Sequence, residues 1–166
     1  MKNSKRLAYS QPVKEDFERF YEIHSDPDTN LFNPNGPMNL SMAEIAFTKL
    51  LDHWNEKGFG TWSIREKENS GFIIGFGGLD YRLYGTETKL NLGYRFDKNY
   101  WGKGYATELA ETAIEFGFNE LKKPEIFAIV RPKHLASIKV LEKCGMKLFA
   151  EKDDVPGQAN SLIYKI

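Results

Sequence analysis

The chain has 166 residues, of which 41% are hydrophobic and 28% are charged, a composition typical of one folded globular domain, which we expect over residues 1–166. Its 23 Lys and Arg residues balance 23 Asp and Glu residues, which argues against binding to nucleic acid through phosphate neutralisation. No apolar run approaches the ~20 residues of a membrane helix, and no apolar segment follows the basic N-terminus as in a signal peptide. The single cysteine, Cys144, excludes an internal disulfide, so we expect a cytoplasmic protein without a membrane partner.

The first third of the chain is expected to form a short strand followed by two helices. The strand is predicted at residues 7–9, and apolar residues at helical spacing from Val13 to His24 predict the first helix. Ser41, followed three residues later by Glu44, has the pattern of a capping box and predicts the start of a second helix, which ends at Gly58.

The remainder of the chain changes between strand and helix periodicity. Three antiparallel strands are predicted at residues 61–65, 72–79 and 89–96. They are followed by a helix at 106–117, a buried strand at 125–130, a short helix at 137–144 and two strands near 147–151 and 161–166. This order predicts an α+β domain with a mixed, mostly antiparallel central sheet of about seven strands and helices on both faces.

The most informative segment is Tyr100-Trp101-Gly102-Lys103-Gly104-Tyr105-Ala106-Thr107, between a predicted strand and a predicted helix. Glycine lets a ligand approach the main chain, and the helix that follows directs N–H groups at one point, so the segment is suited to a pyrophosphate. A dinucleotide-binding turn, a plain helix-entry turn and the coenzyme A loop of an acyltransferase are the three interpretations. Antiparallel strands before the segment and a misplaced third small residue disfavour the first.

Three further segments have a defined order and spacing around this loop, within about residues 71–148: Leu92-Gly93-Tyr94-Arg95-Phe96, Ala136-Ser137-Ile138 and Val140 to Met146. Together with the loop through Glu108, they resemble the GNAT superfamily of N-acetyltransferases. Within it, the group of RimJ/RimL-type acetyltransferases of ribosomal-protein N-termini is the most similar. The resemblance implies an N-acetyltransferase that uses acetyl-CoA and no metal, with direct attack of an amine on the thioester in a ternary complex.

The resemblance also implies which residues bind coenzyme A. Backbone amides from Gly102 to Thr107 would hold the pyrophosphate, after Trp101, which stands where the superfamily usually has Arg or Gln. The strand at 94–96 would pair with the pantetheine amides, and His134 replaces an asparagine that commonly helps to hold pantetheine. The predicted cofactor-binding residues are Tyr94, Arg95, Phe96, Trp101, Gly102, Lys103, Gly104, Tyr105, Ala106, Thr107, His134 and Ser137.

The catalytic groups depart from the commonest family pattern. Leu141 stands where many GNAT enzymes have a tyrosine that donates a proton, and Ser137, earlier on the same helix, is the RimJ/RimL-like alternative. A serine that only bonds to the backbone at the helix start is the competing interpretation of Ser137. Asn91 stands where relatives often have a glutamate, so the general base is Asp80 or Glu87 acting through water, or no strong base is needed.

The missing glutamate bears on the acceptor. An α-amine is about 10% neutral at pH 7, whereas a lysine side chain is well under ~0.1% neutral, so an α-amine tolerates a missing base better. A protein N-terminus is therefore the expected acceptor. The alternatives are a small amine (polyamine, amino acid or antibiotic) and a coenzyme-A-binding module with little catalysis, in each case as a monomer or homodimer.

The other titratable side chains are expected to be structural. His24, His53 and Cys144 show no metal-ligand spacing, and Cys144 lies on an apolar helical face, which predicts core packing. Lys139 and Lys143 are expected to be solvated, with contact to the 3′-phosphate of coenzyme A as a minor alternative.

Overall fold

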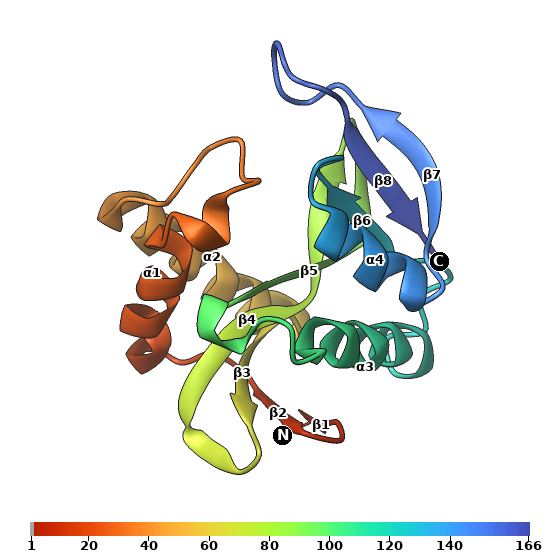
Figure 1. Cartoon of the computed structure of the whole chain (residues 1–166). Helices are drawn as coiled ribbons and strands as arrows, with labels where there is room; N and C mark the ends of the chain where they lie inside the picture. Colours follow the sequence, from red (N-terminus) through yellow and green to blue (C-terminus); the bar gives the residue numbers. More distant parts are fainter. Residues whose placement is uncertain (1) are drawn as a thin grey trace.

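The computed structural model describes residues 2–166, in which one mixed sheet carries helices on both faces (Figure 1). Its strands are β1 (Lys2–Asn3), β2 (Leu7–Ser10), β3 (Thr61–Glu66), β4 (Asn69–Tyr84), β5 (Glu87–Phe96), β6 (Phe127–Val130), β7 (Lys147–Lys152) and β8 (Ser161–Lys165). Its α-helices are α1 (Phe17–Ser25), α2 (Leu40–Lys57), α3 (Tyr105–Asn119) and α4 (Leu135–Lys143). The predicted α+β architecture is confirmed, and no helix in this part of the chain is both long and apolar enough to span a bilayer.

The strand order is β1-β2-β3-β4-β5-β6-β8-β7, and every neighbouring pair is antiparallel except β5 and β6. These two strands run parallel and are in register only at Asn91 and Phe127. Past that point β5 continues to Phe96 without a registered partner on β6. The sheet therefore opens along the second half of β5, and this opening positions the site described below.

Adjacent residues of β4 show that α1 and α3 cover opposite faces of the sheet. The Phe76 ring meets the Phe20 ring of α1 edge-on, with centroids 5.2 Å apart. A Cβ atom added at Gly77 would lie 2.5 Å from Leu109 Cδ2 of α3, so only glycine allows α3 to pack this closely. In Figure 1, α1 and α2 accordingly lie on one side of the opened sheet, and α3 and α4 on the other.

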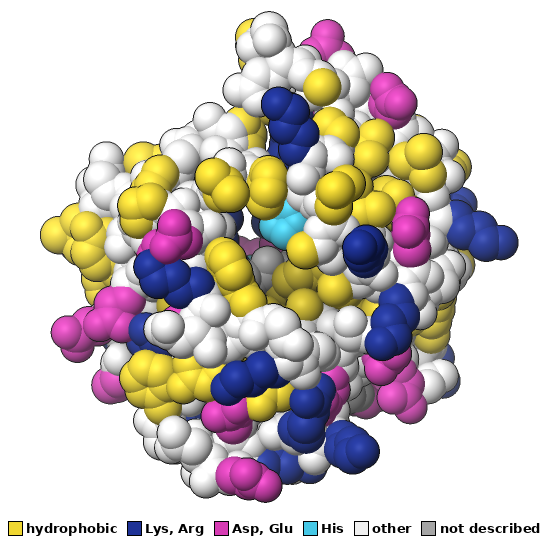
Figure 2. Space-filling view, in the orientation of Figure 1, with side chains coloured by type: hydrophobic (Ala, Val, Ile, Leu, Met, Phe, Trp, Pro, Cys, Tyr) yellow, Lys and Arg dark blue, Asp and Glu magenta, His cyan; other side chains and the backbone are white. Residues whose placement is uncertain are grey.

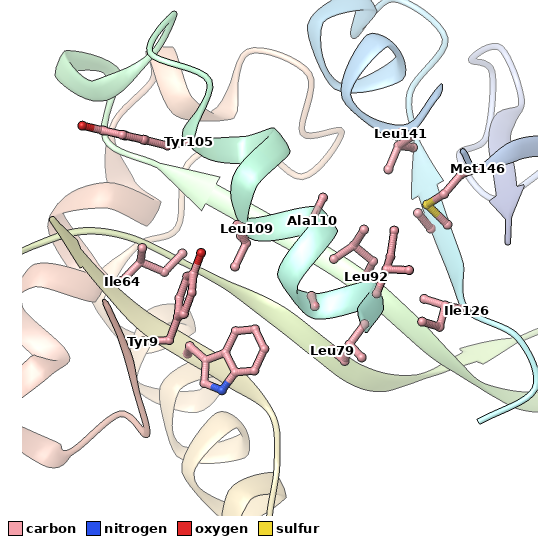
Figure 3. Packing of buried hydrophobic residues seen from close by; sticks show 14 of the residues in the cluster. Tyr9, Ile64, Leu79, Leu92, Tyr105, Leu109, Ala110, Ile126, Leu141 and Met146 are labelled. Carbon is pink, nitrogen blue, oxygen red and sulfur yellow. The ribbon is translucent and has the colours of Figure 1, made fainter. Parts of the chain in front are cut away.

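The main core lies between the sheet and α3 (Figure 3). Leu109 and Ala110 of α3 are fully buried and face Leu79 of β4 and Leu92 of β5. Burying each leucine contributes on the order of 1.5–3 kcal/mol. This packing fixes the first turns of α3, which carry the glycine-rich loop at their N-terminal end.

Several predicted boundaries were wrong: β4 begins at Asn69 and not at 72, β6 at Phe127 and not at 125, and α4 at Leu135 and not at 137. The N-cap of α2 is Asn39, whose side chain accepts a hydrogen bond from the Met42 N–H at 2.9 Å, and not Ser41. Asparagine is as good a cap as serine, and the extended Asn39 comes first in the chain. Strand β4 continues beyond residue 79 to Tyr84, because its polar end still pairs with β5, down to the Tyr84–Glu87 position.

Candidate active site

A cavity of about 690 Å³ occupies the opening between β5 and β6. It opens near the middle of the face shown in Figure 2, where apolar side chains and a histidine border the hollow. The predicted cofactor-binding residues that line it are Tyr94, Arg95, Phe96, Trp101, Gly102, Gly104, Tyr105, Ala106, Thr107, His134 and Ser137. Lys103 does not line it, because its ammonium group turns toward Glu66, 3.8 Å away. The volume is ample for a cofactor-sized ligand.

The glycine-rich loop presents its main chain to this cavity. Gly102 (φ 74°) and Gly104 (φ 79°) have left-handed backbone conformations, which glycine adopts without strain. Gly104 is the N-cap of α3, and no side chain caps this helix end. The first N–H groups of α3 therefore remain as donors beside the cavity, where the helix dipole favours an anion.

Arg6 stabilises this loop through two hydrogen bonds. Its Nη1 donates to the Lys103 carbonyl oxygen at 2.8 Å, and its Nε donates to Glu108 Oε2 at 2.8 Å. Burial alone would raise the pKa of Glu108, but hydrogen bonds from Ser4 and Arg6 outweigh burial and lower it. The Tyr105 hydroxyl also donates to Glu66. These contacts fix the loop before any ligand binds. Local sequence patterns carry no signal for the contribution of Arg6, because Arg6 is distant in the chain.

Trp101 and His134 lie at the two sides of the cavity. The Trp101 indole N–H donates to the Phe96 carbonyl at 2.9 Å and ties the loop to the end of β5. His134 is the N-cap of α4, and its Nδ1 accepts the Ser137 N–H at 3.0 Å. Burial lowers the pKa of His134, so the ring is neutral at pH 7 with its proton on Nε2. It therefore retains one donor, as the asparagine of other family members would.

Ser137 is paired with a tyrosine across the cavity wall. Its Oγ lies 2.9 Å from the Tyr94 Oη, and burial raises the pKa of Tyr94 to about 12. Ser137 lies in the first turn of α4, which begins at Leu135 with His134 as its cap, and its hydroxyl bonds to a side chain and not to the backbone. The contribution of the Tyr94 hydroxyl was missed, because it depends on a contact between distant segments. Leu141 is buried beside this pair.

A second cavity, of about 510 Å³, lies on the opposite face of β4 and β5, beneath α1 and α2. Four residues line both cavities: Arg82, Gly93, Tyr94 and Arg95. The two spaces therefore adjoin at the middle of β5. At Gly93 an added Cβ would meet only the Asn91 amide at 3.5 Å and the Arg82 guanidinium at 3.9 Å. This arrangement lets two ligands approach one strand from opposite faces.

Over residues 6–147 the sequence matches the family described as the acetyltransferase (GNAT) domain. This chain belongs to the GNAT acetyltransferase family. It is similar to YnaD of Bacillus subtilis (strain 168), described as an uncharacterized N-acetyltransferase, with 30% identity over 144 residues that cover 87% of this chain and 81% of YnaD. It is also similar to the uncharacterized protein YkkB of the same organism, with 38% identity over 94 residues. That match covers 55% of this chain and 54% of YkkB, so it spans about half of that relative.

The fold of this GNAT acetyltransferase is similar to that of a spermidine N-acetyltransferase from Vibrio cholerae, solved in complex with CoA and spermine. The TM-score is 0.78, and the match covers 97% of this chain and 95% of the other. At 13% identity this likeness shows the fold alone. The predicted N-acetyltransferase class is thus confirmed by the family and the relatives together.

Asn91, which lines the larger cavity, is bonded to Asp80, which lines the second cavity of the acetyltransferase. Asn91 is buried, accepts a hydrogen bond from the Tyr84 hydroxyl at 2.8 Å and donates to Asp80 Oδ1 at 3.0 Å. Asp80 lines the second cavity. Glu87 lies at the β4–β5 hairpin, 2.7 Å from the Lys89 ammonium group, and lines neither cavity. Of the two carboxylates predicted as possible bases, Asp80 alone has access to the site.

The remaining histidines and the cysteine have structural partners. Burial lowers the pKa of His24 to about 3, and its Nδ1 lies 2.8 Å from the Phe20 carbonyl. The Nδ1–H of His53 donates to the Phe59 carbonyl, and its Nε2 accepts a hydrogen bond from the Tyr81 N–H. No group of three His, Cys, Asp or Glu within residues 2–166 could hold a metal ion. Cys144 packs against the main core, as predicted, and burial raises its pKa to about 11.

Proposed function

We propose that this acetyltransferase transfers the acetyl group of acetyl-CoA to an α-amine, directly and within a ternary complex. The observation that carries this proposal is the pair of cavities adjoining at Gly93. The larger cavity has an anion-binding loop at its edge, and the smaller one has a carboxylate, Asp80, on its wall. Two substrates that must meet for direct transfer require two such spaces.

The larger cavity suits coenzyme A. Backbone amides of residues 102–107 would hold the pyrophosphate, and the unpaired edge of β5 at 94–96 offers main-chain donors and acceptors to pantetheine. The His134 Nε2–H adds one donor on the α4 side. Among the two lysines considered for the 3′-phosphate, Lys139 lines the cavity and Lys143 does not.

When bound, acetyl-CoA supplies the thioester that a neutral amine attacks, and the departing thiolate then needs a proton. Ser137 holds that proton on Oγ, and the Tyr94 hydroxyl, protonated at neutral pH because burial raises its pKa to about 12, replenishes or orients it. Backbone N–H groups on the open edge of β5 stabilise the negative charge that develops on the carbonyl oxygen. This hydroxyl pair favours an enzyme over a coenzyme-A-binding module.

Asp80 removes the proton of the attacking amine, directly or through water. Its carboxylate is held by the Asn91 amide and by the Arg82 guanidinium, 3.5 Å away, and its side chain is 29% exposed, so water reaches it. A weakly placed base is sufficient for an α-amine, which is already partly neutral at pH 7. A protein N-terminus, as in the RimJ/RimL-type group, is such an amine. A free amino acid is also an α-amine, but its own carboxylate raises the pKa of the amine, so its reaction depends more on Asp80.

Thiol release from acetyl-CoA across an amine panel tests this function. The panel contains peptides with free N-termini, N-blocked lysine peptides, amino acids, polyamines and aminoglycosides. We expect release with α-amines, a loss of about 10²-fold in Asp80→Asn, and unchanged rates in Glu87→Gln, the matched control outside both cavities. Acetyl-CoA binding without release on any amine would favour the binding module, and absence of acetyl-CoA binding would refute the proposal.

A further inference from the structure

The charges on the second cavity identify the kind of amine it accepts. Three cations line it, Lys49 from α2, Arg82 from β4 and Arg95 from β5, against one carboxylate, Asp80. His24 on the same wall is neutral, because burial and the nearby Arg95 lower its pKa to about 3. The described lining therefore carries an excess of positive charge. A polycationic acceptor would be repelled from such a space.

Within this excess of positive charge, Arg95 is the arginine that has no carboxylate partner among the described residues. Among the described residues its guanidinium forms no ion pair with a carboxylate, and its Nη1 donates to the amide oxygen of Asn30. Each of the other five arginines is paired with a carboxylate: Arg6 with Glu108, Arg19 with Asp97, Arg65 with Asp16, Arg131 with Asp154 and, in the second cavity itself, Arg82 with Asp80 at 3.5 Å. Burial, followed by the charge of Arg82, lowers the pKa of Arg95 to about 10, so the group still carries its charge at pH 7.

Arg95 lines both cavities, and its charge acts on His24, which lines the second one. Side chains alternate along β5, so Arg95 points to the face opposite Tyr94, whose hydroxyl lies on the α4 side. Arg95 lies beside Asn30, in the short turn after α1, and Arg82 reaches over Gly93 on the same strand pair. A half-buried, unpaired guanidinium is costly in a folded protein unless a ligand neutralises it.

We propose that the acceptor carries a carboxylate within a few bonds of its amine, and that Arg95 and Arg82 bind this carboxylate. The fork of a guanidinium group matches the two oxygens of a carboxylate. The acceptor nitrogen then lies toward Asp80, the single acidic group of the cavity, beside Gly93. This inference rests on the proposed function and narrows it to amino-acid-type acceptors. The carboxylate belongs either to a free α-amino acid or to an acidic N-terminal residue of a peptide.

The test compares acids with their amides. The twenty α-amino acids and their primary amides are assayed for thiol release, beside peptide pairs that begin with Asp or Asn and with Glu or Gln. Amidation lowers the pKa of the α-amine and so enlarges its neutral fraction, which biases the comparison against the acids. We expect kcat/KM to be at least tenfold higher for the best acid than for its amide. A preference for free acids identifies the first source, and a preference for Asp or Glu peptides identifies the second.

Variants assign the effect to Arg95. Arg95→Gln is expected to raise KM for the acid at least tenfold with little change for the amide, and Arg95→Lys to retain part of the preference. Arg82→Gln, at a side chain 55% exposed, is the second variant and does not threaten the fold. Lys147→Gln, on the exposed surface of β7, is the control with unchanged kinetics. Calorimetry should show acetyl-CoA affinity unchanged in all four.

Three outcomes overturn the inference and are distinguishable. If amines are acetylated but amides are used as well as acids, the acceptor is not recognised by a carboxylate, and the proposed function stands. If Arg95→Gln weakens acetyl-CoA binding as much as acceptor use, Arg95 belongs to the cofactor site. If acetyl-CoA binds and no amine reacts, the proposed function fails and the inference fails with it.

Discussion

The Ser137–Tyr94 pair makes a quantitative prediction about proton donation. If Ser137 Oγ protonates the departing thiolate, Ser137→Ala should lower kcat by about 10²-fold or more, which corresponds to ~2.7 kcal/mol. If the 2.9 Å contact with Tyr94 is merely structural, its loss should cost about 0.5–1.5 kcal/mol of folding stability and leave kcat almost unchanged. The two roles therefore differ in the quantity that they change.

A double-mutant cycle separates the two hydroxyl groups. Tyr94→Phe should lower kcat by about tenfold, because the serine loses its oriented partner, and the double variant should be no slower than Ser137→Ala alone. The kcat values come from thiol release at saturating concentrations of both substrates, and melting temperatures are recorded in parallel. Ser70→Ala, at an exposed position at the start of β4, is the matched control for loss of a serine hydroxyl.

The pH profile adds an independent readout. Because burial raises the pKa of Tyr94 to about 12, the pair stays protonated, and no loss of kcat assigned to it is expected between pH 6 and 10. A kcat within threefold of the wild type in Ser137→Ala, together with a melting temperature lower by ~2–4 °C, would refute the assignment. A full loss in Tyr94→Phe with only a small loss in Ser137→Ala would instead make Tyr94 the donor.

Two further predictions concern the loop and the acid stability. Arg6→Ala removes the hydrogen bond to the Lys103 carbonyl. Calorimetry should then show a several-fold higher Kd for acetyl-CoA, while kcat at saturation is preserved. An unchanged Kd would contradict the role of Arg6. The pKa of His24 is about 3 in the folded chain, against 6.5 ordinarily, so the unfolded chain binds the proton more tightly. The contribution of neutral His24 to stability is therefore fully present above pH 6.5 and is lost as the pH falls toward 3. His24→Phe, which keeps the ring stacked on Phe20, should therefore reduce the fall in unfolding free energy between pH 6.5 and 4 in urea titrations, and an equal slope in both proteins would contradict this assignment.

The features predictable from the sequence are those that depend on neighbouring residues. The glycine-rich loop before α3 was predicted from its own local sequence, because Gly102 and Gly104 adopt left-handed backbone angles there and the helix starts immediately afterwards. The alternating apolar residues Leu90, Leu92 and Phe96 of β5 are likewise visible in the sequence, and all three are buried. Boundaries failed where two local solutions competed, as Asn39 and Ser41 did at the start of α2.

Contacts between distant segments were not predictable, because no local pattern encodes them. Arg6 bonds to Lys103 and Glu108, which are 97 and 102 residues away in the chain, and Tyr94 meets Ser137 across the opening between β5 and α4. Each pair forms only when strands and helices far apart in the chain are packed. Sequence reasoning named Ser137 and Tyr94 separately, by resemblance, and did not predict that their hydroxyl groups are paired.

The difference between local sequence features and contacts of distant segments also distinguishes the two halves of the site. In the proposed function, the cofactor half would bind through main-chain atoms, so one contiguous loop of residues 102–107 would suffice to specify it. The acceptor half would bind through side chains drawn from α2, β4 and β5, and its charge is the sum of contributions that no single segment reveals. Family membership therefore fixes the acyl donor more firmly than the acceptor, and the unpaired Arg95 is the feature of this chain from which the acceptor can be inferred.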